Sequence, residues 1–461
     1  MDATSPAGEA KCRKRNENTD ISCCKKLCDL PDALLLRILE LLPMEYAVRT
    51  SVLSRRWEFL WTSIPNLLFD ETEFPNQTLF MNFVERALVC RDCSSMNAFS
   101  LSCSVQSDAA RINAWIAAAV RCNVQKLELQ LYDIEQPYVL PCCLFRCKTL
   151  TEFDLDMPIN LRIPSLVCFR SIKVLRLEQV NFVDNDCTGE LFSGPALQEL
   201  RLTRCSWTAL KVLKISAPNL WRLNISVCDE YDGRNCQVLI NGARLTRFHY
   251  CGELFCDYDI SGLDLLVKAY INVDMGSQQT VDQIHRGYKL LRKLSNVKKL
   301  TLLGEVVKDL DEHNELRNTL PAFRNLTDLK VWDGHGGLEC RQLGVILRRS
   351  PCLRSLEFQE VIYYCTFSCR MDVFSQTFDG ILDPMPPCFL SSLKKITICF
   401  FYATDAEISA VRVLLRTAKA LEELVIHCDE SCSEDAVGDL RHLVEMSNLT
   451  GSCHAIRLII K

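Results

Sequence analysis

A dense apolar segment spans residues 27–71, between a polar stretch and a less patterned one. Its first half has apolar residues at spacings of three and four, which predicts a helix with one wide apolar stripe. Pro31 suits a first helical turn, where its missing N–H costs nothing, and Pro43 is expected to end the helix. The members of the stripe are Leu34, Leu35, Ile38, Leu39 and Leu42.

The second half of this segment predicts two more short helices. One runs through Ala47 and Val48 and ends near Leu53, and Ser54 is placed to cap the next. That third helix carries Trp57, Leu60 and Trp61. Three short helices cannot bury so many large apolar side chains among themselves, so part of the apolar surface is expected to face a partner.

A different period begins near residue 124, where a short strand signal returns roughly every 22 to 29 residues. Each instance has an L-x-x-L-x-L core, for example Leu197, Leu200 and Leu202. Alternation at period two places these side chains on one face of a strand. The period is that of leucine-rich repeats, so residues 124–380 are predicted to form an irregular solenoid.

Two cysteines occupy the turn position of these repeats. Cys205 and Cys228 each follow the last apolar strand position by three residues, where this repeat type uses Asn or Cys inside the stack. Both are therefore expected to be buried. The 27 cysteines of the chain are an odd number spread over 461 residues, which favours reduced thiols over a disulfide framework.

The remaining segments complete an α/β organisation. Residues 1–26 are polar and non-periodic, which predicts a disordered tail. Residues 72–123 hold two helix-like stretches, LFMNFVERALVC and ARINAWIAAAV, which are expected to cap the open end of the solenoid. The interval between Glu357 and Lys394 is too long for one repeat and predicts an inserted loop.

Composition indicates which class of partner the chain binds. The net charge of -5 gives no electrostatic footprint for nucleic acid or an anionic membrane, which favours protein partners. No apolar run approaches the length of a membrane helix, and the polar start lacks the apolar core of a secretory signal. We therefore expect a cytoplasmic protein, a nuclear one, or both.

Catalytic and metal motifs are incomplete. Cys90 and Cys93 form a C-x-x-C, but no second pair follows at zinc-finger spacing. No cysteine motif is coupled to a histidine base, and the GHGG at 334–337 follows a repeat strand, where glycine favours a turn. The expectation is a protein without a catalytic site, metal or cofactor.

Two stretches carry a resemblance to a known family. LPDALLLRILELLP followed by SVLSRRWEFLW resembles the plant-type F-box, although Tyr46 stands where that family generally has Asp. CFLSSLKKITICFF followed by EISAVRVLLRTAKALEELVI resembles the FBD segment of plant F-box/leucine-rich-repeat proteins, with FFYATDAE replacing its Gly-rich turn. The resemblance implies a small three-helix F-box at 27–71, then the solenoid, then FBD-like repeats at 381–461.

That resemblance implies a substrate-recognition subunit of an SCF-type ubiquitin ligase. The F-box would bind a Skp-type adaptor and, through it, a cullin, while the repeats would bind a target protein that the sequence does not identify. Leu35, Leu53 and Leu60 fit equally well as residues that hold the helices together. The positions that match the adaptor-contacting set are Leu30, Pro31, Leu34, Ile38, Leu39, Leu42, Pro43, Val52, Leu53, Trp57 and Trp61.

Two other functions stay open at this point. One is a leucine-rich-repeat interaction protein that is not committed to target degradation. The other is a sensor that binds a small ligand in a pocket of the solenoid. Neither the need for a ligand nor the role of the FBD-like segment follows from the sequence.

Overall fold

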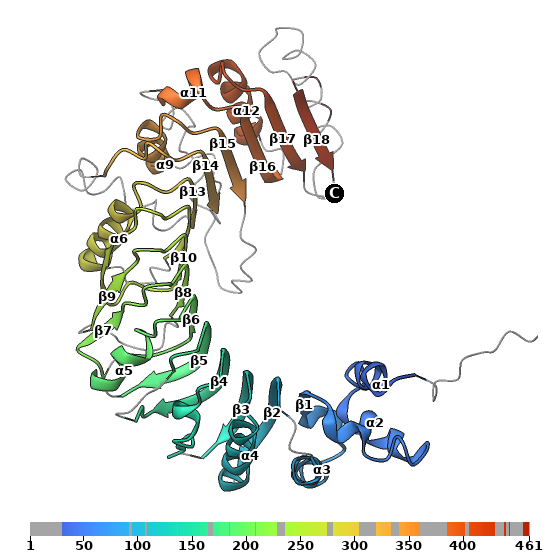
Figure 1. Cartoon of the computed structure of the whole chain (residues 1–461). Coiled ribbons are helices and arrows are strands. Elements are labelled where there is room, and N and C mark those ends of the chain that lie inside the picture. The colour runs from blue at the N-terminus through green and yellow to red at the C-terminus, as the bar shows by residue number, and fades with distance from the viewer. Residues whose placement is uncertain are drawn as a thin grey trace, which may run out of the picture. The chain divides into compact units, whose positions relative to one another are not determined.

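A computed structural model of the chain divides into two compact units, residues 1–64 and 65–461 (Figure 1). It describes residues 30–91, 95–106, 108–135, 137–164, 169–183, 185–207, 209–227, 236–273, 280–303, 320–332, 341–359, 385–401, 405–428, 438, 442 and 455–460. The predicted tail at 1–26, Cys93, Cys228, the GHGG at 334–337 and most of the predicted inserted loop lie outside the described residues. No described helix is long and apolar enough to cross a membrane.

The first unit is helical and short. Pro31 and Pro43 stand at the N-caps of its two α-helices, in the positions where a missing N–H is tolerated. The first helix ends at Leu39, so Leu42 lies beyond it. The helical elements are α1 Asp32–Leu39, α2 Met44–Arg49, the 3₁₀ turn η2 Thr50–Val52 and the 3₁₀ turn η3 Leu60–Ser63.

The predicted third helix is present only as the 3₁₀ turn η3, which carries Leu60 and Trp61, and not as an α-helix. Residues 54–64 form successive turns closed by i→i+3 bonds, such as Trp57 N–H to the Ser54 carbonyl at 2.9 Å. Two side chains also donate hydrogen bonds to backbone carbonyls here. Trp61 Nε1 donates to the Glu58 carbonyl at 3.1 Å, and Thr62 Oγ1 donates to the Phe59 carbonyl at 2.6 Å. Such local bonds offer the backbone an alternative to the α-helical ladder.

The second unit is built on one large parallel sheet, in which the described residues form fifteen strands. The strands alternate buried and more exposed residues, as in β3, where Leu127, Leu129 and Leu131 are buried. In sheet order the strands are β1 Asn66–Asp70, β2 Ala98–Gln106, β3 Lys126–Ile134, β4 Glu152–Leu161, β5 Val174–Phe182, β6 Glu199–Thr203, β8 Arg222–Ser226, β10 Arg247–Cys251, β12 Lys268–Asn272, β13 Lys299–Leu303, β14 Asp328–Trp332, β15 Ser355–Gln359, β16 Lys395–Phe401, β17 Glu423–Cys428 and β18 Ala455–Ile460.

The stack begins earlier than predicted. β1 pairs with β2, and β2 pairs with β3, so the region predicted to be a separate helical cap already belongs to the repeats. The two predicted helices are present as α3 Gln77–Cys90 and α4 Ala109–Arg121, and α4 packs on β2. Their flanking strands were missed because NLLFD and AFSLSCSVQ lack the L-x-x-L-x-L core.

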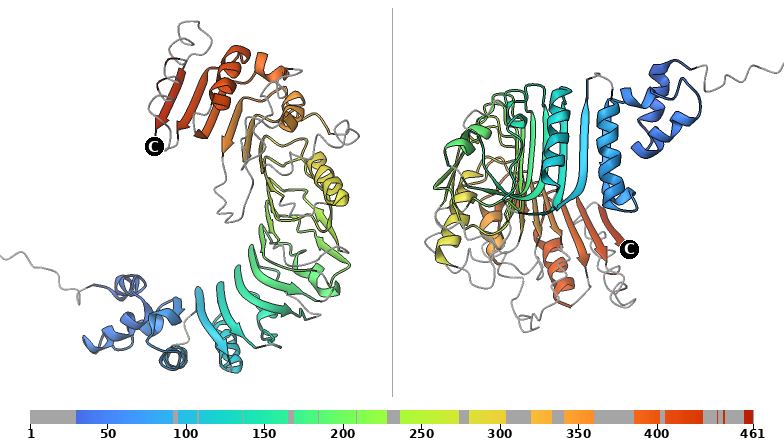
Figure 2. Two further views of the ribbon diagram at one scale, coloured as in Figure 1. Left: turned by 180° about the vertical axis from the view of Figure 1, so that it is seen from behind. Right: turned by 90° about the horizontal axis from the view of Figure 1, so that it is seen from below.

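Helices and a small second sheet cover one face of the large sheet (Figures 1 and 2). The small sheet has the order β11-β9-β7. These outer elements are β7 Val212–Ile215, β9 Gln237–Asn241, β11 Asp257–Ser261, α5 Asn185–Leu191, α6 Val281–Lys293, α9 Arg341–Arg348, α11 Pro387–Ser391 and α12 Asp405–Thr417, with the 3₁₀ turns η4 Glu71–Glu73 and η5 Leu144–Arg146. The strands and helix of the FBD-like segment, β16, α12 and β17, continue the same pattern without a break in the sheet.

The predicted turn role of Cys205 is confirmed. Its side chain is 1% exposed, and its thiol donates to the Leu177 carbonyl at 3.2 Å. The described cysteines are free thiols.

Candidate functional site

Large apolar side chains are exposed on the first unit. Leu41 is 84% exposed, Val52 86% and Phe59 67%, in a unit whose described part covers only residues 30–64. A concentration of exposed apolar groups on so small a body is typical of a protein-binding surface. The exposed large apolar residues of this unit, named here the apolar surface, are Leu34, Leu41, Leu42, Tyr46, Val52, Leu53 and Phe59.

Most of the predicted adaptor-contacting residues are accessible. Leu30 and Ile38 are half-buried, while the others in this group are exposed. Whether they contact an adaptor stays a prediction. The exposed members are Pro31, Leu34, Leu42, Pro43, Val52 and Leu53.

Three predicted contact residues are instead buried: Leu39, Trp57 and Trp61. The stripe of α1 consists of two neighbouring rows, and the row of Leu35 and Leu39 points into the unit, where α1 packs on η3. In this structure these three side chains hold the unit together and do not belong to the apolar surface. Of the three residues that fitted either a contact role or a role in holding the helices together, Leu35 is buried, Leu60 is half-buried and Leu53 is exposed.

The prediction missed Leu41, Tyr46 and Phe59. Leu41 and Phe59 fall between the positions that the spacing of three and four selects, so periodicity alone gave no signal for them. Tyr46 departs from the family pattern at a position outside the stripe; the residue is 54% exposed, and the Arg49 guanidinium lies 5.5 Å from the centroid of its ring. A count of apolar residues outside the stripe would have found all three.

Arg56, near the end of the first unit, forms hydrogen bonds with residues at the beginning of that unit. Its guanidinium donates from Nε to Asp32 Oδ1 at 2.9 Å and from a terminal nitrogen to the Leu30 carbonyl at 2.6 Å. Asp32 also lies in the first turn of α1, where a carboxylate interacts favourably with the helix dipole. These bonds fix the backbone at Leu30, next to the exposed Pro31.

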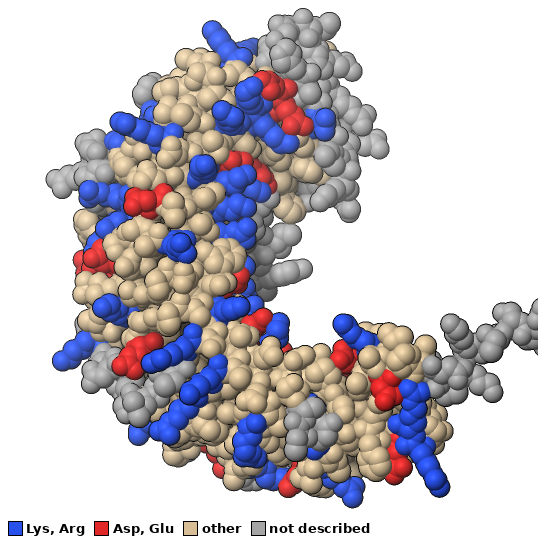
Figure 3. All heavy atoms as spheres, in the orientation of Figure 1, with Lys and Arg blue, Asp and Glu red and all other residues tan. Residues whose placement is uncertain are grey.

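The large sheet presents its more exposed side chains on the face opposite the outer helices, named here the open face. Oppositely charged residues pair across neighbouring strands of this face, for example Lys126 with Glu152 at 2.7 Å and Lys395 with Glu423 at 2.8 Å. Basic and acidic side chains recur along the repeats (Figure 3). This polar face offers a broad surface to a protein partner.

Comparison with known proteins matches both units. A family model described as "F-box domain" matches residues 27–69, and one described as "At1g61320/AtMIF1, LRR domain" matches residues 92–458. The second match covers most of the chain. The chain belongs to the F-box/LRR-repeat family.

Similar members of the F-box/LRR-repeat family come from Arabidopsis thaliana. The F-box/FBD/LRR-repeat protein At2g04230 is 30% identical over 73% of this chain and 74% of its own length. The F-box/LRR-repeat protein At4g14103 is 29% identical over 74% of this chain and 93% of its own length. The F-box/LRR-repeat protein At3g59210 is 28% identical over 95% of each chain.

Within this F-box/LRR-repeat protein, the F-box match ends inside β1, beyond the compact unit that closes at residue 64. The LRR match begins before residue 124, in agreement with the early start of the sheet. It also includes the FBD-like segment, which therefore forms the last repeats of the same stack. Together the two domains make the chain a protein-interaction adaptor, in which the F-box implies a Skp-type partner and the repeats imply a target-binding role.

Proposed function

We propose that this chain is the substrate-recognition subunit of an SCF-type ubiquitin ligase. The observation that carries the proposal is the apolar surface, which leaves residues such as Val52 and Leu53 in solvent on a unit of F-box type. An adaptor that covers this surface would remove large apolar groups from water, at roughly 25 cal/mol per Å² of apolar area. The adaptor would in turn connect the chain to a cullin.

The chemistry of ubiquitin transfer would then belong to other subunits. This chain contributes proximity: a target bound on the repeats is held near the charged ubiquitin carrier, and an encounter between two free proteins becomes a reaction within one complex. No catalytic group, metal or cofactor of this chain takes part in the proposed function.

Adaptor capture tests the first half of the proposal. Val52→Asp combined with Leu53→Asp places two charges on the apolar surface, and both side chains are exposed, so the fold should be retained. We expect these changes to abolish co-purification of a Skp-type adaptor. Val89→Asp with Leu265→Asp is the matched control, because both residues are exposed apolar groups of the second unit. Equal adaptor capture by the two double variants would refute the proposed surface.

Target half-life tests the second half. A receptor for degradation shortens the life of a protein bound to its repeats, whereas a plain interaction protein leaves it unchanged. We expect the Val52→Asp, Leu53→Asp chain to bind the target and to lengthen its half-life in cells. If the half-life is the same with the intact chain and with the variant, the interaction protein that is not committed to degradation is the better description.

A further inference from the structure

Four cations stand side by side on the open face of the large sheet. Arg222, Arg247, Lys268 and Lys299 occupy one register position on β8, β10, β12 and β13, and are named here the cationic row. Neighbouring strands lie about 4.8 Å apart, and like charges directly opposite one another destabilise a sheet. The row therefore departs from the pairing of opposite charges seen elsewhere on this face, and it works against folding stability.

The two ends of the row are neutralised and the middle is not. Arg222 lies 3.7 Å from Glu199 on β6, and Lys299 lies 3.3 Å from Asp328 on β14. Within the described part of the chain, neither Arg247 nor Lys268 forms an ion pair.

An aromatic contact holds one of these central cations in place. The Arg247 guanidinium lies 5.4 Å from the centroid of the Trp221 ring, a cation–π distance. The contact orients the guanidinium but does not neutralise its charge. The centre of the cationic row thus keeps positive charge available to an anionic partner.

A pair of stacked rings lies beside the row, in the next outward register position. The rings of His249 on β10 and Tyr270 on β12 are parallel to within 2°, with centroids 4.2 Å apart. Burial, and then the charges of Arg201 and Arg222, lower the pKa of His249 to about 4. The imidazole is therefore neutral near pH 7, and the stack forms an uncharged aromatic contact surface next to the cations.

Acidic residues limit the length of the row. Glu199 and Asp328 occupy the same register position on the two strands that border it. The four strands between them span about 14 Å, which is the length of four or five extended residues. The ion pairs at both ends add no net positive charge, so a long polyanion such as nucleic acid gains little beyond the centre of the row, whereas a short acidic peptide fits on that centre.

We propose that the cationic row, together with the His249–Tyr270 stack, binds a short acidic segment of the target protein. Carboxylates of that segment pair with Arg247 and Lys268, and an aromatic or apolar side chain contacts the stacked rings. The inference rests on the proposed function, since it names the kind of target that the repeats accept.

Direct binding to the full-length chain tests the inference. The probe is a fluorescently labelled peptide, Glu-Asp-Tyr-Glu-Asp, and the same peptide with Lys in place of each acid is the negative probe. We expect saturable binding of the acidic peptide only, weakened about tenfold or more by Arg247→Gln with Lys268→Gln. Lys126→Gln with Lys395→Gln removes the same charge from the same face outside the row, and should leave the affinity within about twofold.

Three results would overturn the inference. They are a failure of the acidic peptide to bind the intact chain, an equal loss in both double variants, and equally tight binding of a single-stranded oligothymidylate to the row. The same preparations are tested for adaptor capture, which should be intact in the Arg247→Gln, Lys268→Gln chain. If the intact chain binds the peptide but does not capture the adaptor, the proposed ligase function is contradicted and the peptide site stands. If it captures the adaptor but does not bind the peptide, the peptide site is contradicted and the ligase function stands.

Discussion

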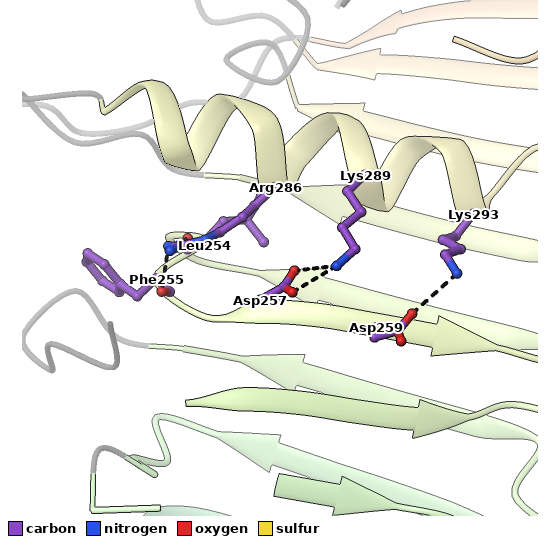
Figure 4. Close-up of polar contacts among 7 residues, drawn as sticks. All are labelled: Leu254, Phe255, Asp257, Asp259, Arg286, Lys289 and Lys293. Carbon is purple, nitrogen blue, oxygen red and sulfur yellow. Dashed lines mark hydrogen bonds and ion pairs between the residues drawn. The ribbon is translucent and has the colours of Figure 1, made fainter. Parts of the chain in front are cut away.

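Lys289 on α6 donates to both carboxylate oxygens of Asp257 on β11, each at 2.8 Å (Figure 4). One turn further along, Lys293 reaches Asp259 at 3.3 Å. One turn earlier in the helix, Arg286 donates to the Phe255 carbonyl at 2.6 Å. A row of polar contacts therefore joins α6 to the small outer sheet.

These contacts position the helix more than they stabilise it. Both partners of the Lys289–Asp257 pair are about two-fifths exposed, and exposed pairs contribute about 0–1 kcal/mol. Lys289→Met should therefore lower the free energy of unfolding by less than about 1 kcal/mol. Leu291→Ala, on the buried side of the same helix, should lower it by about 2–5 kcal/mol. Chemical denaturation of both variants checks the order, and a larger loss for Lys289→Met would contradict it.

Trp57 should act through folding and not through direct adaptor contact. Its side chain is buried, so Trp57→Ala removes core volume from the first unit at a cost of about 3–5 kcal/mol. Adaptor capture should fall together with the thermal stability of that unit. In Val52→Asp, by contrast, capture should fall while the melting temperature stays close to that of the intact chain. If the Trp57→Ala chain is as stable as the intact chain but has lost adaptor capture, Trp57 contacts the adaptor directly.

The sequence predicted this core only in part. Periodicity located the α1 stripe but could not separate its two rows, because Leu34 and Leu35 are both leucine and the choice of inward row depends on where η3 packs. Similarly, L-x-x-L-x-L located most strands of the large sheet, while β1 and β2 lack that core. The small sheet is built of short alternating runs such as QVLIN, and nothing in these runs tells which sheet they join. The cationic row depends on register between strands more than twenty residues apart, which a single sequence does not supply.

The early start of the sheet fixes where the chain can be cut. A chain of residues 65–461 keeps β1, whereas one of residues 72–461 loses it and leaves β2 as an uncovered edge with Phe99 and Leu101 beside it. We expect the first truncation to stay soluble and to unfold cooperatively. The second should melt at lower temperature or aggregate. Circular dichroism and light scattering distinguish them, and identical behaviour would show that β1 adds nothing to the stack.

Cysteine labelling reports on the repeat core. Burial raises the pKa of the Cys205 thiol to about 12, so almost no reactive thiolate is present near pH 7. Cys142 and Cys352 are exposed and serve as internal references. Mass spectrometry after native alkylation should find Cys205 unlabelled at the time when labelling of both reference cysteines is complete. Labelling of Cys205 at the reference rate would mean that this turn opens to solvent.

His249 should make the protein less stable in mild acid. Its folded pKa of about 4 lies below the ordinary histidine pKa of 6.5, so between these values the unfolded chain binds a proton that the folded chain does not. The contribution of His249 to the free energy of unfolding is therefore complete above about pH 6.5 and falls as the pH decreases toward 4. The cause is burial of the ring, followed by the nearby charges of Arg201 and Arg222.

Substitution isolates that contribution. His249→Gln should lower stability at pH 7 through loss of the stack with Tyr270, yet its stability should fall less between pH 7 and pH 5.5 than that of the intact chain. The exposed His285 on α6 provides His285→Gln as the control for loss of one histidine. Denaturation curves at both pH values give the difference directly. If His249→Gln and the intact chain lose the same free energy over this interval, the ring titrates in the folded protein as it does in the unfolded one, and the uncharged surface beside the cationic row would not exist at the acid end of that range.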